Sequence, residues 1–273
     1  MKTKYFITLI SLFLMFSSCR EESSVQTFPL NDFKQIPVPI INSPEHDSVR
    51  ARSGSWFSVA IADGKLQIGR DVYEPKLEYS LPEGKLISID QGEFGGGLYY
   101  KPNDTTKRNF FVTIDGKHKT VIANPWDGGL MDEESVLKNY GHPFLIKNGN
   151  VRYIFPYQDS ISVIEGLAHK SLRTGMIYSL KFKNNNFILA NPYYFRDFPI
   201  VITIFNNKIY VLTEKSLFVV DKSSRKQVFS NMFWYGLDPN SIAVKDERNI
   251  YVGMRGGYAK INFPLKKVAF INA

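Results

Sequence analysis

The sequence predicts an all-β fold, and three observations support that prediction. From Trp56 to the C-terminus, short runs rich in Val, Ile, Phe and Tyr are separated by turns of Gly, Asn and Asp. Between these runs, no segment sustains the 3.6-residue periodicity of an amphipathic helix. Two C-terminal segments, which begin at Val201 and Ser241, repeat one strand pattern 40 residues apart.

The first 18 residues have the composition of an export signal. Two lysines precede an apolar run over residues 5–16, and two serines stand directly before Cys19. The apolar run is too short to span a bilayer. This segment resembles the signal of bacterial lipoproteins, with Phe-Ser-Ser-Cys at the cleavage box. The resemblance implies that residues 1–18 form a signal peptide and that Cys19 becomes the lipidated first residue, carrying acyl chains such as palmitate.

The residue after Cys19 indicates the membrane to which a lipoprotein would be sorted. Arg20 follows Cys19, where inner-membrane retention in related sorting systems uses Asp. By that resemblance we expect a lipid-anchored protein of the bacterial cell envelope, at the outer membrane. The sequence leaves open whether the protein faces the periplasm or the cell surface.

Charge limits the kinds of partner, and cysteine content limits the sources of stability. The formal net charge is +8, and the basic residues occur singly or in pairs without a basic helix. This dispersed pattern argues against nucleic-acid binding. Because Cys19 is the only cysteine, disulfides cannot stabilise the fold. A composition with 44% hydrophobic and 14% aromatic residues supplies a large core instead.

Residues 19–50 are interpreted as a lipidated tether. Proline alternates with apolar residues over 36–44, which favours an extended or polyproline backbone. Two alternatives remain open for this stretch: it docks along the edge of the domain as a strand, or it holds the domain off the membrane.

Residues 51–273 form the predicted β domain, in which paired strands meet at tight turns. Asp-Gly and Asn-Gly sequences supply the positive φ angles that short hairpins require. The predicted hairpins turn at Asp63-Gly64, Asp115-Gly116, Asn148-Gly149-Asn150, Asn206-Asn207 and Glu247-Arg248-Asn249.

The repeat spacing indicates the architecture. A unit of 40 to 45 residues with about four strands is typical of a β-propeller blade. The domain thus resembles the loosely repeating β-propellers of exported proteins, although it has no series of WD dipeptides or kelch double glycines. The resemblance implies about five four-stranded blades, or six if the N-terminal strand closes the ring. A β-sandwich is the alternative fold.

Aromatic segments between the predicted blades are the candidate partner-binding sites. We expect these segments to form loops along one rim of the domain, where flat rings offer a large contact area at low entropic cost. Each could instead pack one blade against the next. The candidate residues are Trp126, Tyr193, Tyr194, Trp234, Tyr235 and Arg255.

Asn240 is a candidate metal ligand. The sequence Asp-Pro-Asn-Ser around it resembles a segment of calcium-dependent lactonase-type propellers, in which the asparagine binds the metal. The other ligands of that family are not identifiable here. The alternative is an Asn that stabilises a turn before a strand. No cofactor is expected apart from this calcium candidate.

The sequence therefore favours an envelope lipoprotein whose domain binds a protein or glycan partner through aromatic rim loops. It shows no catalytic motif, so an enzyme is the less favoured interpretation. Two alternatives remain: a calcium-dependent hydrolase that uses Asn240, and an immunity-type protein that neutralises a toxin in the envelope.

Overall fold

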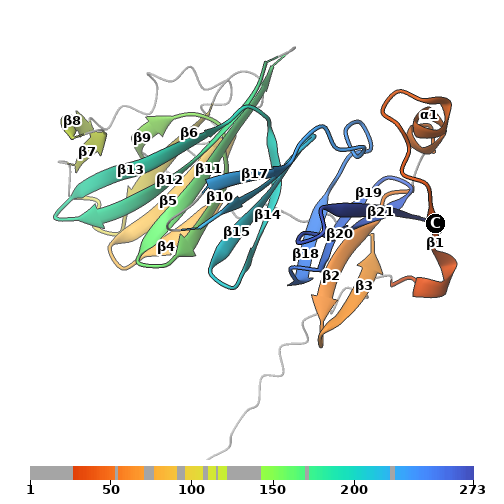
Figure 1. Ribbon diagram of the computed structural model, residues 1–273. Helices are drawn as coiled ribbons and strands as arrows, with labels where there is room; N and C mark the ends of the chain where they lie inside the picture. Colours follow the sequence, from red (N-terminus) through yellow and green to blue (C-terminus); the bar gives the residue numbers. More distant parts are fainter. Residues whose placement is uncertain are drawn as a thin grey trace, which may run out of the picture.

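The computed structural model describes residues 27–52, 55–70, 77–90, 96–106, 110–114, 116–121, 143–169, 172–221 and 225–273. Most of these residues lie in β-strands, which form mainly antiparallel sheets, and this confirms the all-β prediction (Figure 1). Two of the candidate residues, Cys19 and Trp126, lie outside the described residues.

Within the described chain, three sheets are built on four consecutive antiparallel strands. The first has β10 (Val151–Tyr157), β11 (Ser160–His169), β12 (Leu172–Lys183) and β13 (Asn186–Phe195). The second has β14 (Pro199–Phe205), β15 (Lys208–Thr213), β16 (Leu217–Val220) and β17 (Arg225–Phe229). The third has β18 (Ser241–Asp246), β19 (Asn249–Met254), β20 (Gly257–Asn262) and β21 (Lys267–Asn272).

The N-terminal strands are less regular. β2 (Ser58–Ala62) and β3 (Lys65–Gly69) form a pair, and a four-stranded sheet has the order β4 (Glu78–Leu81), β5 (Gly84–Asp90), β6 (Gly96–Pro102) and β9 (Phe144–Asn148). Between β6 and β9 in the chain, β7 (Phe110–Ile114) and β8 (Lys117–Val121) leave this sheet. β7 instead pairs in parallel with β13 of the next sheet.

Turn chemistry explains the hairpins. Asn206 and Asn207 have φ values of 46° and 56°, and Asp63 and Gly64 have φ values of 51° and 69°. Asn, Asp and Gly tolerate this left-handed region best, so the twist of the turn matches that of the strands. The hairpins predicted at these two turns are confirmed.

The first strands of successive sheets lie near one another. β2 lies beside β18, and β18 lies beside β14. These three strands line one cavity of about 450 Å³, and β4, β10 and β14 line another of about 500 Å³. Figure 1 shows the β14–β17 sheet between the β10–β13 sheet and the β18–β21 sheet.

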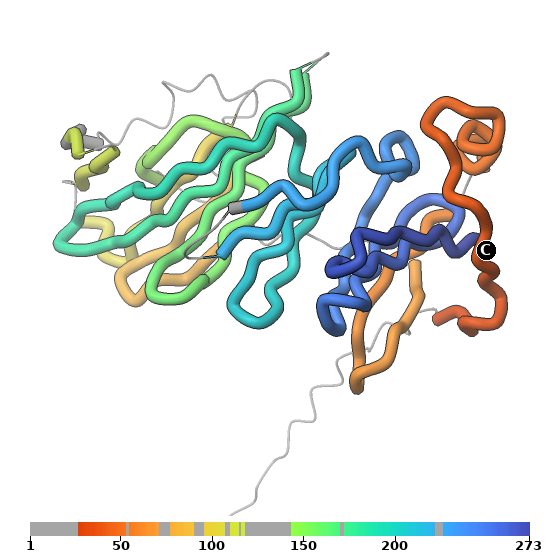
Figure 2. Tube along the Cα trace, viewed as in Figure 1, coloured from red at the N-terminus to blue at the C-terminus, as the bar shows by residue number. Residues whose placement is uncertain are grey.

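Residues 27–50 dock on the C-terminal sheet. β1 (Lys34–Ile36) pairs antiparallel with β21, after a short 3-10 helix, η1 (Leu30–Asp32). Of the two alternatives for this stretch, docking as an edge strand is what residues 34–36 adopt. Figure 2 shows the orange N-terminal segment beside the dark blue C-terminal strands.

A short helix, α1 (Pro44–Arg50), follows β1. The Ser43 hydroxyl caps it by accepting from the backbone N–H of His46 at 3.2 Å, and Pro44 occupies the first turn. The His46 ring is buried, and its Nε2 lies 2.9 Å from the carbonyl oxygen of Phe233. The helix is thereby held against the loop between β17 and β18.

Buried side chains fill the spaces between the sheets. One cluster joins the β14–β17 and β18–β21 sheets and includes Trp234, Leu237 and Phe270. Another joins the β10–β13 and β14–β17 sheets through Phe195 and Phe218, whose ring centroids are 4.8 Å apart. Among the described residues, no helix combines the length and hydropathy of a membrane-crossing segment.

Candidate functional site

Four loops gather at one end of the three C-terminal sheets, and we call this surface the loop face. They are residues 196–198, 214–216, 230–240 and 255–256. In an antiparallel meander, the chain enters the first strand and turns from the second to the third at the same end. Backbone bonds join the loops: Glu214 N–H to the Phe198 carbonyl at 3.1 Å, Met232 N–H to the Lys215 carbonyl at 3.0 Å, and Arg255 N–H to the Leu237 carbonyl at 2.8 Å.

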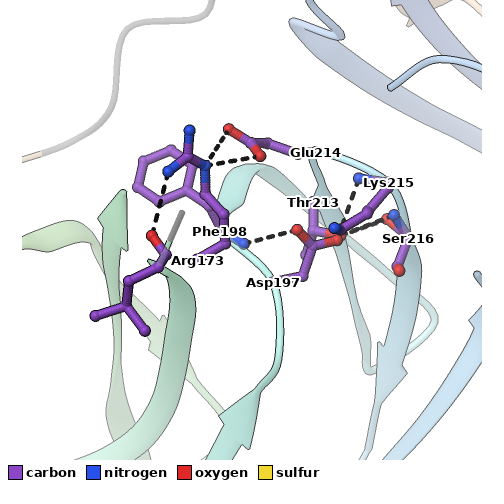
Figure 3. Close-up of polar contacts among 8 residues, drawn as sticks. Arg173, Asp197, Phe198, Thr213, Glu214, Lys215 and Ser216 are labelled. Atoms are coloured by element: carbon purple, nitrogen blue, oxygen red, sulfur yellow. Dashed lines mark hydrogen bonds and ion pairs between the residues drawn. The ribbon is translucent and has the colours of Figure 1, made fainter. Parts of the chain in front are cut away.

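A buried carboxylate fixes two of these loops. Asp197 accepts hydrogen bonds from the Thr213 hydroxyl at 2.5 Å, the Phe198 N–H at 2.9 Å and the Lys215 N–H at 3.1 Å (Figure 3). Thr213 in turn accepts from the Ser216 N–H at 2.9 Å. Because a buried carboxylate is costly unless it is hydrogen-bonded, this network holds the backbone in one conformation.

An ion pair ties the neighbouring sheet to the same loops. The Arg173 Nε lies 3.2 and 3.1 Å from the two carboxylate oxygens of Glu214 (Figure 3). Both side chains are partly buried. The pair therefore links the start of β12 to the 214–216 loop.

Cations lie over aromatic rings across this surface. Within the described residues of the loop face and its rim, Arg152 lies 5.3 Å from the Phe198 centroid, Lys215 lies 5.2 Å from that of Tyr235, and Arg255 lies 4.7 Å from that of Trp56. Each ring attracts its cation through the negative potential of its face. Rings held in this way present a preformed surface to a partner.

Arg255 is the most connected of these cations. Its guanidinium forms an ion pair with Asp238 and donates to the Arg50 carbonyl at 2.8 Å. The Trp56 indole N–H also reaches Asp238, at 3.5 Å. The side chain expected at a rim thus joins α1, the start of β2 and the 230–240 loop.

The 230–240 loop owes its shape to residues with positive φ. Asn231, Gly236 and Asp238 have φ values of 51°, 80° and 50°. These turns place two adjacent aromatic residues in opposite environments. Tyr235 is 42% exposed, whereas Trp234 is fully buried. The expectation that Trp234 lies on the rim is wrong, because its ring packs in the core beside Phe233.

The expectation that Tyr193 and Tyr194 lie in a loop is also wrong. Residues 191–195 continue β13, and the loop is limited to 196–198. Tyr193 is partly buried and its ring packs 5.3 Å from that of Phe195. Tyr194 projects from the opposite side of the strand and is 71% exposed.

Asn240 lies directly before β18. Its side-chain oxygen accepts from the Ser241 hydroxyl at 2.8 Å, and its N–H bonds to the Gly253 carbonyl at 3.0 Å. Ser241 also accepts from the Val59 N–H at 2.9 Å, which ties β2 to β18. In the described ranges, no three His, Cys, Asp or Glu residues converge as a metal site. The contacts of Asn240 are those of a strand-entry turn.

Sequence reasoning missed Trp56, Asp197, Phe198 and Lys215. Apart from Phe198, which follows Asp197 directly, the partners of Trp56 and Asp197 are separated from them by 16 to 199 positions, so local patterns cannot reveal them. A weak signal exists in Asp-Phe-Pro at 197–199, where a carboxylate precedes a proline-led strand.

A second buried carboxylate lies near this end of the β10–β13 sheet. Glu165 forms an ion pair with Lys147 at 2.6 Å and accepts from the Tyr178 hydroxyl at 2.8 Å. Burial, and then the neighbouring Glu165 charge, raise the pKa of Tyr178 well above its usual value. Like Asp197, Glu165 is engaged by its neighbours, an arrangement suited to holding structure in place.

The comparisons with known proteins give no family. No family model matches the chain, and no curated protein matches it significantly.

Proposed function

We propose that this protein is a binding module that recognises an acidic protein partner through the loop face. The observation that carries the proposal is the pair of exposed aromatic rings on the loop face. The Tyr235 ring lies against Lys215, and the Trp56 ring lies against Arg255. Asp197 fixes the backbone at Lys215 by accepting from its N–H. Trp, Tyr and Arg are the residue types most enriched in interface hot spots. Rigid loops also lower the entropic cost of binding.

Charge favours an acidic partner over a neutral one. The chain carries a formal net charge of +8. On the loop face, Arg152 and Lys215 lie over aromatic rings, while the carboxylates of Glu214 and Asp238 are paired with arginines. An acidic surface would therefore associate faster through electrostatic steering.

We further propose that the sheets are blades of one five-membered β-propeller. The blades would be β2–β3, β4–β5–β6–β9, β10–β13, β14–β17 and β18–β21. Three of these are four-stranded meanders, and their first strands share cavities, as expected around a central channel. In this arrangement the loop face is one rim of the ring.

The anchor remains a proposal from the sequence. A lipid on Cys19 would attach the protein to the bacterial envelope and leave the loop face available. The residues between Cys19 and the start of the described chain at residue 27 would be the link to the membrane.

Co-purification from cells tests the partner. The full-length chain, cross-linked in the cells that produce it, is compared with a Trp56→Ala/Tyr235→Ala variant. The expected result is a stoichiometric acidic protein bound to the parent chain and lost from the variant. An Ile204→Ala/Leu265→Ala variant, which removes two exposed apolar side chains outside the loop face, is the matched control. Two outcomes would contradict the proposal: capture of a glycan in place of a protein, or recovery of the same amount of protein partner with both variants.

A further inference from the structure

Residues 29–40 lie along the outer edge of the C-terminal sheet. The strand order in that sheet is β1–β21–β20–β19–β18, and β18 is the strand that lies beside β14. β1 is therefore the strand of this sheet that is farthest from the β14–β17 sheet. Figure 2 shows the red-orange N-terminal segment on the right-hand side of the view, away from the rest of the molecule.

Apolar side chains project from this edge into solvent. Leu30 is 49% exposed, Val38 is 40% exposed and Ile40 is 78% exposed. No other large hydrophobic side chain in the described chain is as exposed as Ile40. A single exposed apolar residue is ordinary, whereas several on one short segment are typical of a surface that contacts a partner or a membrane.

Buried residues within the same segment hold these side chains outward. Phe33 is buried, and its ring packs 5.1 Å from that of Phe57. Pro39 is also buried, although it stands between the exposed Val38 and Ile40. The backbone between Phe33 and Pro39 includes β1, which is paired with β21. The segment is thus fixed on the sheet, and its exposed apolar side chains point away from the core.

The charges near this edge are balanced. Across residues 29–52, three exposed basic side chains accompany three exposed acidic ones: Lys34, Arg50 and Arg52, and Asp32, Glu45 and Asp47. Attraction to an anionic surface is therefore not what this edge offers. Its apolar side chains suit the boundary between headgroups and acyl chains of a bilayer, where binding strength follows the apolar area that is buried.

The length of the chain before the segment favours a membrane over a protein as the partner. Eight residue steps separate Cys19 from Thr27, where the described chain begins. An extended chain advances at most about 3.5 Å per residue, so this link spans no more than about 28 Å. A lipid on Cys19 would hold the 29–40 segment close to the bilayer.

We propose that residues 29–40 form a membrane-docking edge, on which Leu30, Val38 and Ile40 enter the boundary region of the bilayer that holds the lipid on Cys19. This inference rests on the proposed anchor and adds the orientation of the domain. Three apolar side chains bind a bilayer weakly, but the short link raises their effective concentration at its surface. The 196–198 and 214–216 loops lie on the neighbouring sheets and stay open to a protein partner.

Depth-dependent fluorescence quenching tests the docking edge. The full-length lipidated chain is reconstituted in phosphatidylcholine vesicles with an environment-sensitive fluorophore on Ile40→Cys or, as the control, on Ile204→Cys. Both positions are exposed isoleucines, and Ile204 lies in β14. Spin-labelled lipids should quench the fluorophore at position 40 and shift its emission to the blue. The fluorophore at position 204 should show neither effect.

Double variants make the result specific to the apolar edge. Leu30→Ser/Val38→Ser, added to Ile40→Cys, should reduce the quenching at least twofold, because two of the three inserting side chains are lost. Leu172→Ser/Ile188→Ser removes two exposed apolar side chains of the β10–β13 sheet and should leave the quenching unchanged. Equal quenching in the two double variants would overturn the proposal.

Vesicle flotation of the same samples separates the docking edge from the anchor. If the protein floats with the vesicles but position 40 is quenched no more than position 204, the docking edge is wrong and the anchor stands. If the protein does not float, the anchor is wrong and the docking edge fails with it. Neither result affects the loop face, which co-purification tests separately.

Discussion

The two ends of the β10–β13 and β14–β17 sheets hold their carboxylates in opposite ways. At the loop face, Asp197 is buried and accepts three hydrogen bonds from the chain itself. At the opposite end, near the β10–β11 turn, the Asp159 side chain is 79% exposed and forms an ion pair with Lys181 at 3.0 Å. A buried carboxylate that is satisfied within the chain holds the backbone in one conformation, whereas an exposed ion pair contributes little to stability.

The largest expected effect separates two neighbours in the 230–240 loop. Trp234→Ala should lower the free energy of unfolding by about 4 kcal/mol, because it empties a fully buried site. Tyr235→Ala should cost less than about 1 kcal/mol, since only an exposed ring and its contact with Lys215 are lost. Urea denaturation followed by circular dichroism measures both. Similar losses in the two variants would contradict the distinction between core and surface in this loop.

The next largest effect distinguishes two carboxylates, one at each end of the β10–β13 and β14–β17 sheets. Asp197→Ala should cost about 3 kcal/mol, because two backbone N–H groups and the Thr213 hydroxyl lose their acceptor. Asp159→Ala at the opposite end, near the β10–β11 turn, should cost less than about 0.5 kcal/mol, since this residue is 79% exposed on its side chain and pairs with an exposed Lys181. Thermal unfolding of the two variants, measured side by side, checks the difference. An Asp197→Ala protein as stable as Asp159→Ala would show that the loop face is not fixed by this network.

Alkaline pH should lower the free energy of unfolding through Tyr178. Burial and the Glu165 charge raise the folded-state pKa of Tyr178, while the unfolded chain releases this proton near its usual pKa of about 10. Stability is therefore fully present below about pH 10 and falls as the pH rises above it, because the folded state holds the proton that the unfolded state loses.

Tyr178→Phe should flatten this decline, at a cost near neutral pH of about 1 kcal/mol for the lost bond to Glu165. Unfolding free energies at several pH values between neutrality and pH 11 measure the slope. Tyr194→Phe, which removes a phenol from an exposed position, is the control. An unchanged slope in Tyr178→Phe would rule out Tyr178 as its source.

Much of the fold follows from local sequence. The turn residues Asn206-Asn207 and Asp63-Gly64 fixed both the place and the type of their hairpins, because few residues other than Gly, Asn and Asp adopt positive φ cheaply. The last two sheets were also anticipated by their shared pattern. Tyr193 and Tyr194 were expected in a loop between blades, whereas the structure has them in β13, beyond the point where the pairing with β12 shifts.

The candidate site was harder to predict from the sequence than the fold, for a physical reason. Whether an aromatic residue is buried depends on segments far away in the chain, and adjacent Trp234 and Tyr235 are chemically similar but differ completely in exposure. The pairing of Arg255 with Trp56 spans almost 200 positions. Tyr235 and Arg255 were singled out as aromatic and basic loop residues, but their partners become visible only after folding.

The most direct test of the loop face as the partner-binding surface is photo-crosslinking in the producing cells. A photoreactive phenylalanine analogue is placed at Tyr235 on the loop face or at Ile204 near the opposite end of β14; both positions are exposed. The account predicts a discrete crosslink to one acidic protein from position 235 and none from position 204. The same crosslink from both positions, or from position 204 alone, would contradict it.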